Sequence, residues 1–406
     1  MNRASMVRLA ACGIIGLGAA LLIAALLLST YTAGKIRKIP LNIDQTLVST
    51  GTGTALDPAS LSAGAGAKFI IDKNVPLVSQ QAMTVETPAN AEVVTFQVGT
   101  SVRRSDKQKD NGLLLAMVDT VTLNRSTAEA VSDDDRPGGS VQKPRTISDD
   151  KPATNIALPH QGLSYRFPFN TEKRSYPYFD PIAQKAFDAN YDGEDDVNGL
   201  TTYRFTQNVG YDADGKLAEP IKYASLYDKN EDGEVTARAE LWGLEGDDPY
   251  EPITMTRYYA AQRTFWVDPV SGTIVKAEEH ANHYYARDPL RPEVALTDYK
   301  VTSSEQTVES QVAAARAERD RVALWSRVLP ISLAAAGAVA LIGGALLGLF
   351  STRVEMALPE ESEDDIDIGL FGRDETGPMP AAQAPTEKIP TRRAPNSSSE
   401  SPPPQR

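Results

Sequence analysis

Two long uncharged runs limit what this 406-residue chain can fold into. Residues 9–28 and residues 328–350 contain no charged side chain over 20 and 23 positions. An α-helix rises about 1.5 Å per residue, so each run is long enough to cross the hydrocarbon core of a bilayer, which is about 30 Å thick. Core helices of water-soluble proteins rarely stay uncharged over such a length. The sequence therefore predicts two transmembrane helices.

The first run is predicted to stay in the mature protein. The apolar part of a cleaved signal peptide is usually shorter, about 7–15 residues. The residues after the run, Ser29 to Ala33, also lack a clean small-x-small cleavage pattern. Cys12 lies inside the run and is the only cysteine of the chain, so we expect neither an internal disulfide nor thiol catalysis outside the membrane.

Two spans place both termini on one side of a membrane, and the chain divides accordingly. The predicted parts are a cytoplasmic N-terminus (1–8), a first transmembrane helix (9–28), a β-rich extracytoplasmic domain (35–300), a helix leading to the membrane (301–327), a second transmembrane helix (328–350) and an acidic, Pro- and Ser-rich cytoplasmic tail (351–406) that we expect to be disordered. Charges beside the spans do not decide the orientation, because long domains translocate largely regardless of charge. We expect an inner-membrane protein, and its net charge of −13 argues against a nucleic-acid partner.

The large domain is predicted to be mainly β, with a smaller α part. Residues 91–100 and 113–123 are rich in β-branched and apolar side chains and read as a hairpin. Residues 254–267 and 273–286 flank the turn residues Asp268 to Gly272 and predict a second, long hairpin. We therefore expect a curved antiparallel sheet or a sandwich, interrupted by a long mobile loop over residues 124–155.

A helix is predicted just before the second apolar run. Thr302 to Glu305 fits a capping box, and the sequence up to Arg327 is rich in Ala, Glu and Arg. Pro330 predicts a kink further on. The second run contains Gly344 and Gly348, and the first contains Gly13, Gly16 and Gly18. Small residues let membrane helices approach closely, so the two helices are expected to pack against each other or against a partner.

Two acidic segments resemble the start of a calcium loop. Asp228, Asn230 and Asp232 precede Gly233, and Asp188, Asn190 and Asp192 precede Gly193. An EF-hand loop also needs a glutamate at position 12, where these segments have Ala239 and Gly199. We therefore interpret both as plain β-turns, with a structural calcium ion at Asp228, Asn230 and Asp232 as the alternative and no other cofactor expected.

No catalytic pattern is present, and we do not expect an enzyme. His160 is isolated, and His280 and His283 are three residues apart, which puts them on opposite faces of a strand. The chain has no HExxH zinc motif and no G-x-S-x-G nucleophile motif. Carboxylates are too numerous in so acidic a chain for any pair to be informative.

Several longer phrases are too specific for composition to explain. They are HQGLSYRFPF (160–169), TEKRSYPYFD (171–180), VNGLTTYRF (197–205) and WVDPVSGTI (266–274). Together with the two spans, over residues 1–350, they resemble an actinobacterial envelope family often labelled the "porin PorA family". The resemblance implies a mycolate-type cell envelope and a periplasmic domain tethered to the inner membrane. It also implies an accessory role in moving envelope glycolipids such as trehalose mycolate, beside an inner-membrane lipid exporter.

The function expected from these observations is non-enzymatic binding or trafficking of envelope glycolipids. Because apolar helices stand where a membrane barrel would need alternating strands, we do not predict a pore. The alternatives are a scaffold of the envelope-assembly machinery with no ligand of its own, and an envelope hydrolase. Aromatic side chains are the candidates for lining a lipid cleft, with ordinary core packing as the alternative. These candidates are Tyr165, Phe167, Phe169, Tyr178, Phe179, Tyr258 and Tyr259.

Overall fold

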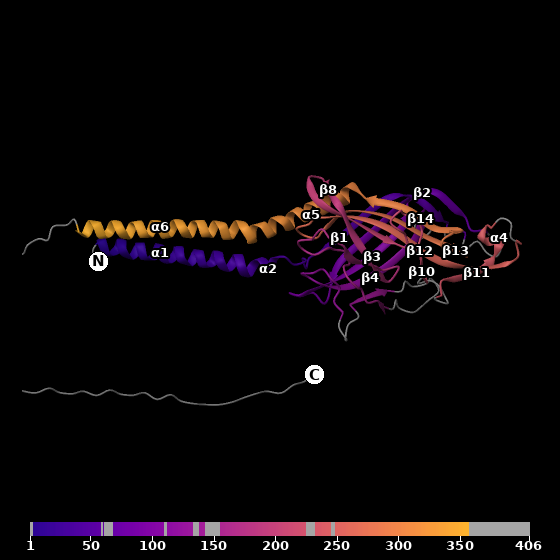
Figure 1. Cartoon of the computed structure of the whole chain (residues 1–406), viewed down its shortest axis with the longest axis horizontal. Helices are drawn as coiled ribbons and strands as arrows, with labels where there is room; N and C mark the ends of the chain where they lie inside the picture. The colour runs from indigo at the N-terminus through magenta and orange to yellow at the C-terminus, as the bar shows by residue number, and fades with distance from the viewer. Residues whose placement is uncertain are drawn as a thin grey trace, which may run out of the picture. The chain divides into compact units, whose positions relative to one another are not determined.

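The protein is a curled antiparallel sheet with long apolar helices at both ends of the chain (Figure 1). The structure, a computed structural model, describes residues 3–57, 60, 68–108, 112–132, 138–142, 155–224, 232–244 and 248–356. Fourteen strands in this part of the chain form one sheet. The predicted fold class is confirmed, and the curved sheet rather than the sandwich is the form it takes.

The strands follow one another around the sheet largely as hairpins. The order along the main path is β6-β5-β4-β3-β2-β1-β14-β13-β12-β9-β8-β7, and β10 and β11 each pair with β12. Their bounds are β1 (Asp44–Leu56), β2 (Ile71–Glu86), β3 (Val93–Arg104), β4 (Leu113–Asn124), β5 (Gly139–Gln142), β6 (Asn155–Ala157), β7 (Tyr176–Asp180), β8 (Lys185–Val197), β9 (Leu200–Val209), β10 (Ile221–Lys222), β11 (Glu234–Arg238), β12 (Pro252–Val267), β13 (Ile274–Ala286) and β14 (Val294–Ser303). Both predicted hairpins, β3–β4 and β12–β13, are present.

The first and last strands of the chain lie side by side in the middle of the sheet. β1 pairs with β14 from Ser49 opposite Ser303 to Ala55 opposite Thr297. The chain therefore enters the sheet next to the point where it leaves it. This places the N-terminal and C-terminal helices at neighbouring positions on the sheet.

A short segment around Leu163 links β7, at one end of the strand path, to the chain just past β4. The Leu163 amide donates to the Pro177 carbonyl at 2.8 Å, and the Phe179 amide donates to the Leu163 carbonyl at 2.9 Å, so the segment runs beside β7. On its other side the Ala130 amide, just past β4, donates to the Gly162 carbonyl at 3.0 Å. The sheet is curled far enough for one extra stretch of chain to bridge its two halves.

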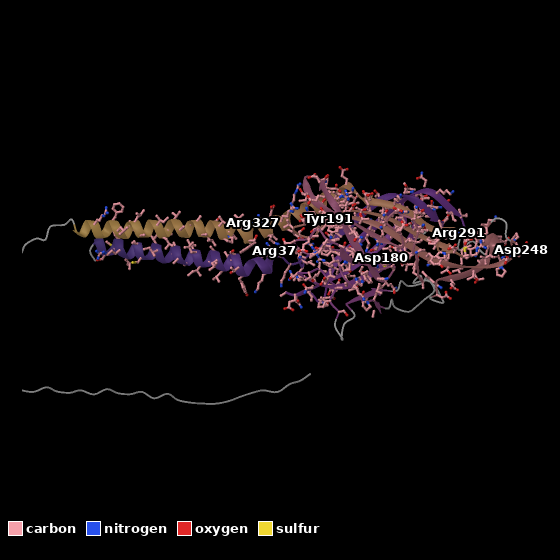
Figure 2. The ribbon with its side chains drawn as sticks, in the orientation of Figure 1. Arg37, Asp180, Tyr191, Asp248, Arg291 and Arg327 are labelled. Carbon is pink, nitrogen blue, oxygen red and sulfur yellow. The ribbon has the colours of Figure 1, made fainter. Side chains whose placement is uncertain are left out.

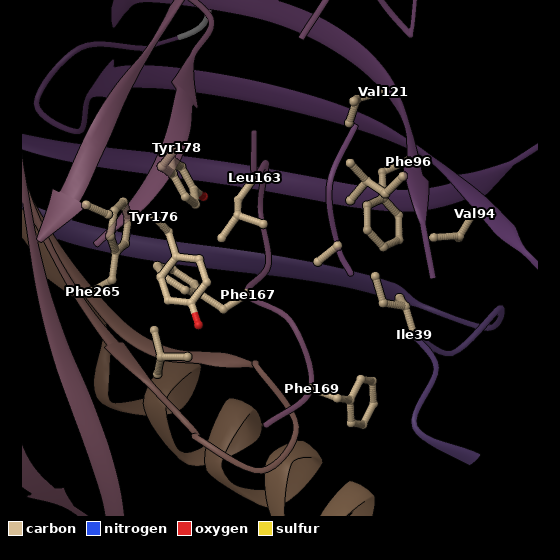
Figure 3. Close-up of a cluster of buried hydrophobic side chains, with 14 of the residues drawn as sticks. Ile39, Val94, Phe96, Val121, Leu163, Phe167, Phe169, Tyr176, Tyr178 and Phe265 are labelled. Carbon is tan, nitrogen blue, oxygen red and sulfur yellow. The ribbon is translucent and has the colours of Figure 1, made fainter. Parts of the chain in front are cut away.

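The main hydrophobic core lies inside the curl (Figure 3). Phe167 is fully buried, and its ring centroid lies 4.7 Å from that of Phe205 and 5.8 Å from that of Tyr178. Phe96 and Leu163 belong to the same cluster. Inward-facing residues of strands far apart in the sequence meet here, because each strand alternates its side chains between the two faces.

The helices at the two ends of the chain are interrupted at matching places. The N-terminal helix comprises α1 (Arg3–Leu27), a π-helical turn η1 (Leu28–Thr32) and α2 (Ala33–Ile36). The C-terminal helix comprises α5 (Glu305–Ala323), a π-helical turn η3 (Leu324–Val328) and α6 (Leu329–Met356). A short α4 (Ala239–Trp242) packs beside the sheet.

Two details of the C-terminal helix differ from expectation. The N-cap is Ser304, whose side chain accepts from the Thr307 amide, so the predicted capping box at Thr302 is wrong by two residues. The wider η3 turn ends at Val328, two residues before Pro330. Proline has no amide hydrogen and its ring crowds the carbonyl four residues earlier, and a π-helical turn accommodates both.

The two apolar helices pack against each other through glycines (Figure 1). A Cβ atom added at Gly18 would lie 2.8 Å from the Gly337 carbonyl oxygen. One added at Gly344 would lie 2.7 Å from a side-chain carbon of Ile15. A Cβ added at Gly16 would meet no atom within 4 Å, so this glycine faces away from the partner helix. The predicted close packing is confirmed for Gly18 and Gly344.

Exposed apolar side chains gather on these helices and not on the strands. Both helices are long and apolar enough to cross a membrane, over Ser5–Tyr31 and within Glu305–Phe350. Among the described residues, the large exposed apolar side chains outside these two ranges are Leu41, Ile70, Tyr250 and Leu290, and none of the four lies in a strand. A lipid-facing barrel would need an outward apolar band on its strands. Arg37 follows the N-terminal helix directly, and Arg327 lies in η3, just before the uncharged run 328–350 of the C-terminal helix (Figure 2).

Two predictions of irregular structure are wrong in part. Residues 188–194 lie within β8 and not in a turn; Gly193, with φ of 130°, sits at a register shift between β8 and β9. The predicted mobile loop over residues 124–155 contains β5, which pairs with β4, and ends at β6. Asp228, Asn230 and the predicted tail beyond residue 356 lie outside the described residues.

A largely buried ionic cluster ties strands together inside the curl, and Figure 2 labels one of its members, Asp180. Asp180, at the end of β7, is fully buried; it accepts from Arg263 Nη1 at 2.6 Å and from the Tyr259 hydroxyl at 2.8 Å. Arg263 Nε donates to Glu279 at 2.8 Å. Burial by itself raises the pKa of Asp180, but the Arg263 charge and the hydrogen bonds outweigh it, so the net pKa is below the ordinary value. Strands β7, β12 and β13 are thereby tied together.

The glycine contacts predict a position-dependent effect of a larger side chain in the helices. Gly18→Leu should lower the free energy of unfolding by about 1–3 kcal/mol, because the added atoms overlap the facing backbone. Gly16→Leu, two residues earlier and on the other side of the helix, should change it by less than about 0.5 kcal/mol, because its side chain points into open space. Unfolding of the full chain in mixed micelles, followed by helical circular dichroism, measures both. Equal effects of the two substitutions would contradict this helix packing.

The ionic cluster predicts a pH-dependent contribution to stability. Asp180→Asn should lower the free energy of unfolding at pH 7 by about 3–5 kcal/mol, because it leaves Arg263 buried with less compensating charge. A carboxylate with a lowered pKa stabilises the fold above its unfolded pKa, about 3.9, and loses that contribution as the pH falls through its folded value. The stability difference between the wild type and Asp180→Asn should therefore shrink below about pH 4. Asp214→Asn, at an exposed turn, is the control; a pH-independent difference at position 180 would disprove the charge assignment.

Candidate functional site

Two adjoining cavities occupy the concave side of the curled sheet. The first, of about 570 Å³, is lined by residues from β1–β4 on one side, from β12–β14 on the other, and by α5. The second, of about 390 Å³, is lined mainly by β4, by β12–β14 and by the residues that follow β7 and β10. Both volumes are in the range of small-molecule sites, which is about 300–1,000 Å³.

The first cavity has charged groups of both signs in its wall. Arg263 and Glu279 of the ionic cluster line it, and so do Arg166 and Glu318, which form an ion pair at the α5 side. Arg166 also donates to the Ser271 carbonyl at 2.9 Å, while its Nε atom is buried without a hydrogen-bond partner. Such a wall can solvate polar solutes of either charge.

A hydrogen-bonded group of four side chains closes one end of the first cavity. His160 contacts the Ser164 hydroxyl through Nδ1 at 2.8 Å and Asp119 through Nε2 at 3.2 Å. The Tyr165 hydroxyl donates to the same carboxylate at 2.5 Å. Burial, followed by the Asp119 charge, raises the pKa of Tyr165 well above its ordinary value. His160, isolated in the sequence, therefore has partners that satisfy its buried polar atoms, and this accounts for the group.

The second cavity combines an apolar wall with one polar corner. Residues 113–117, Ile182 and Leu296 supply much of the apolar wall. Arg257 and His283 line the corner together with Tyr223, whose hydroxyl is 2.7 Å from His283 Nδ1. Burial, and then the charge of Arg257, lowers the pKa of His283 to about 3. The imidazole is therefore neutral at physiological pH.

The two cavities meet at a constriction formed by residues common to both walls. These six residues are Val102, Leu115, Met117, Pro181, Ile182 and Tyr299. They come from β3, β4 and β14 and from the turn after β7. The cavities therefore adjoin, with these six residues between them.

The seven aromatic candidates from the sequence divide between this space and the core. Tyr165, Tyr178 and Phe179 line the first cavity. Phe167 and Phe169 belong to the main core cluster, and Tyr259 to a second cluster. Tyr258 is half-buried and its ring lies 5.7 Å from that of Tyr284. Only three of the seven are placed where they could touch a solute in either cavity.

Sequence reasoning missed the polar residues of the site. Asp180 and Arg263 are 83 positions apart, and Tyr223 and His283 are 60 apart. The one signal in the sequence was the spacing of His280 and His283, which predicts that they face opposite sides of a strand. The structure agrees with this prediction. His280 pairs with Asp298 at 2.9 Å and is partly exposed, whereas His283 is buried. Nothing local in the sequence marks the others.

The acidic segments do not come together as a metal site in the described part of the chain. No group of three or more His, Cys, Asp or Glu side chains with metal-binding geometry is found there. Asp232 accepts from the Glu234 amide at 3.0 Å, as in a turn, whereas Asp192 contacts Arg204 at 3.1 Å. Asp228 and Asn230 are outside the described residues, so calcium binding there stays a prediction.

Comparisons with known proteins identify the family. A family model described as "Porin PorA" matches residues 10–346. A protein of Corynebacterium amycolatum named "Porin PorA" is 31% identical over 312 residues, which is 68% of this chain and 78% of the relative. Another of that name, from Corynebacterium resistens, is 31% identical over 332 residues, covering 67% of this chain and 76% of the relative.

These names overturn the function expected from the sequence. Binding and trafficking of envelope glycolipids is wrong as an expectation, because the family and both relatives are named as porins, and the scaffold and hydrolase alternatives gain no support. The names also count against our expectation of no pore. A physical reason lies in the first cavity, where the charged side chains of Arg263 and Glu279 make the wall a poor environment for an acyl chain.

The match covers most of both apolar helices and every described strand, from β1 to β14. The resemblance seen in the sequence is confirmed over this range. The apolar helices and the family together make this chain a membrane protein of the cell envelope. It belongs to the Porin PorA family.

Proposed function

We propose that this protein is a non-enzymatic channel protein in which the interior of the curled sheet is a passage for small solutes. The two apolar helices hold that passage at a membrane. The observation that carries the proposal is the junction of the two cavities, since six residues line both. The name shared by the two relatives supports the same class of function.

The distribution of polarity favours the interior of the sheet as the route. The charged side chains of Arg263, Glu279, Arg166 and Glu318 in the first cavity replace part of the hydration of a polar solute. The two helices offer no such route, because glycine contacts bring their backbones together. One helix pair cannot enclose water, so in this proposal several copies assemble to carry solutes across the bilayer itself.

Conductance of the purified full-length protein in planar lipid bilayers tests the passage. We expect discrete conductance steps whose frequency rises faster than linearly with protein concentration, because assembly precedes conduction. Leu115→Trp should lower the conductance of each step by about half or more, because its bulk narrows the constriction shared by the cavities. Leu290→Trp, at an exposed site away from both cavities, is the matched control and should leave the steps unchanged. A silent protein, or steps unaffected by Leu115→Trp, would refute the passage.

We further propose an orientation, with the sheet outside the cytoplasm and both termini inside, at the inner membrane. The two apolar helices require both chain ends to lie on one side, opposite the sheet, and the labelling below identifies that side. In a Cys12→Ser background, Lys216→Cys at an exposed turn of the sheet should react with a membrane-impermeant maleimide in intact spheroplasts. Ser5→Cys should react only after permeabilisation. The reverse pattern would place the sheet in the cytoplasm.

A further inference from the structure

Positive side chains gather where the two apolar helices join the sheet. In this region α2 packs against α5 and η3, and η1 packs against η3, so the two chain segments that leave the membrane lie side by side. Six basic residues on or beside these segments form what we call the cationic collar. They are Lys35, Arg37, Lys38, Arg125, Arg321 and Arg327.

Collar residues that are distant in the sequence are close in space. The Ile39 amide donates to the Arg125 carbonyl at 2.9 Å, and Arg125 Nε donates to the Ile39 carbonyl at 2.7 Å. Partial burial, and then the charge of Arg321, lowers the pKa of Arg125. Figure 2 labels Arg37 and Arg327 close together, in agreement with the packing of α2 against η3. The six positive charges therefore belong to one region of the molecule.

Arginines of the sheet have counter-charges that the collar lacks. Arg104 and Arg263 each form an ion pair with an aspartate. In the described part of the chain, no carboxylate pairs with a collar residue. Lys35 donates to a tyrosine hydroxyl and Lys38 to a backbone carbonyl, while Arg37 Nε is buried without a hydrogen-bond partner.

Nearby carboxylates do not balance the collar. Among the described residues, exposed carboxylates beside the collar segments are those of Asp44, Glu92 and Asp320. Glu318 also lies on α5, but it is paired with Arg166. Positive charge is therefore in excess on this part of the surface.

The collar coincides with the edge of the apolar runs. Lys35 is the first charged residue after the run 9–28, and Arg327 directly precedes the run 328–350. Tyr31 of η1 is 65% exposed and Trp325 of η3 is 40% exposed. Tyrosine and tryptophan are enriched where the hydrocarbon core of a membrane meets the lipid headgroups. These features place the collar at the level of the headgroups.

Anionic lipid surfaces attract such cations over a short range. Each Lys or Arg near an anionic leaflet strengthens binding by about fivefold, and the attraction falls off within a Debye length of about 10 Å. Arg321 lies about 9 Å along the helix from Arg327, so its charge is within this range. Arg125 is half-buried beside it, and a phosphate group would supply the counter-charge that both lack.

We propose that the cationic collar is a contact surface for the headgroups of anionic phospholipids in the leaflet next to the sheet. Phosphate oxygens accept hydrogen bonds from the exposed guanidinium groups of Arg321 and Arg327, while Tyr31 and Trp325 lie at the lower edge of the headgroup layer. The contact fixes the height of the sheet above the membrane. No lipid enters the curled sheet, so this inference does not depend on the proposed passage.

Lipid retention by the full-length protein tests the contact. The protein is incorporated into nanodiscs that contain phosphatidylglycerol and phosphatidylcholine in equal amounts and with the same acyl chains. Native mass spectrometry then counts the lipids of each kind that stay bound after release. Phosphatidylglycerol should be retained at least about fivefold more than phosphatidylcholine, because the charges of several cations act together. Equal retention would overturn the proposal and leave the collar for an acidic protein surface.

Charge substitutions connect the preference to the collar. Arg321→Gln/Arg327→Gln should bring the ratio of the two lipids to within about twofold of one, whereas Arg321→Lys/Arg327→Lys should retain most of the preference because it keeps both charges. Lys216→Gln/Arg291→Gln removes the same charge from exposed turns of the sheet and should leave the ratio unchanged. Circular dichroism verifies that each variant is folded. An unchanged ratio in folded Arg321→Gln/Arg327→Gln would refute the contact.

Inorganic phosphate separates headgroup contact from binding of a free anion. Equilibrating the nanodiscs in phosphate instead of acetate, at the same ionic strength, should change the lipid ratio by less than about twofold. The reason is that the bilayer holds headgroups at the collar at a high effective concentration, which a dissolved anion does not reach. Loss of the preference in phosphate would overturn the proposal in favour of a free-anion site.

Discussion

The interior of this protein depends on the buried ion pair between Asp180 and Arg263. Asp180 ends β7, and Arg263 lies in β12, beyond β8 and β9 in the sheet. The Arg263 guanidinium also contacts Gln207 of β9, Glu279 of β13 and Tyr259 of its own strand. One side chain therefore joins β7, β9, β12 and β13. A guanidinium inside a protein needs hydrogen-bond partners of this kind. These partners place polar side chains inside the curl, where apolar side chains would otherwise pack together and fill the space.

This constraint explains why the inside of the sheet holds two cavities as well as a core. The aromatic cluster around Phe167 fills one part of the curl by close packing. The ionic cluster lies beside it, and Glu279 is hydrogen-bonded to the Tyr299 hydroxyl at 3.3 Å. Tyr299 is shared by both cavity walls. The constriction between the cavities is thus fixed in position by the same network that ties the strands together.

The sequence predicts those parts of the structure that local patterns determine. The two spans follow from uninterrupted apolar runs, and the β12–β13 hairpin follows from Asp268 and Gly272 at turn positions, where Gly272 has φ of 75°. Residues 188–194 show the limit of such patterns. Their acidic, glycine-containing sequence is typical of a turn, but they lie in β8, where a register shift at Gly193 accommodates them. The cavities could not be predicted, since Arg257, His283 and Leu115 meet only when strands distant in the sequence become neighbours. The aromatic candidates divide between the core and the first cavity for a related reason: side chains of one type serve equally in a core and in a cavity wall.

The pairing of β1 with β14 has a consequence for how the chain comes to be folded. The Val48 amide is hydrogen-bonded to the Thr307 hydroxyl, 259 positions along the chain, at the central seam of the sheet. During synthesis the first strand must therefore wait, with an unpaired edge, until the last one has been made, and contacts so distant in sequence form slowly. The hairpins on either side can assemble earlier as separate halves. Meanwhile the membrane helix that precedes β1 fixes one end of the chain. This limits the positions that β1 can take and lowers the entropy cost of pairing it with β14.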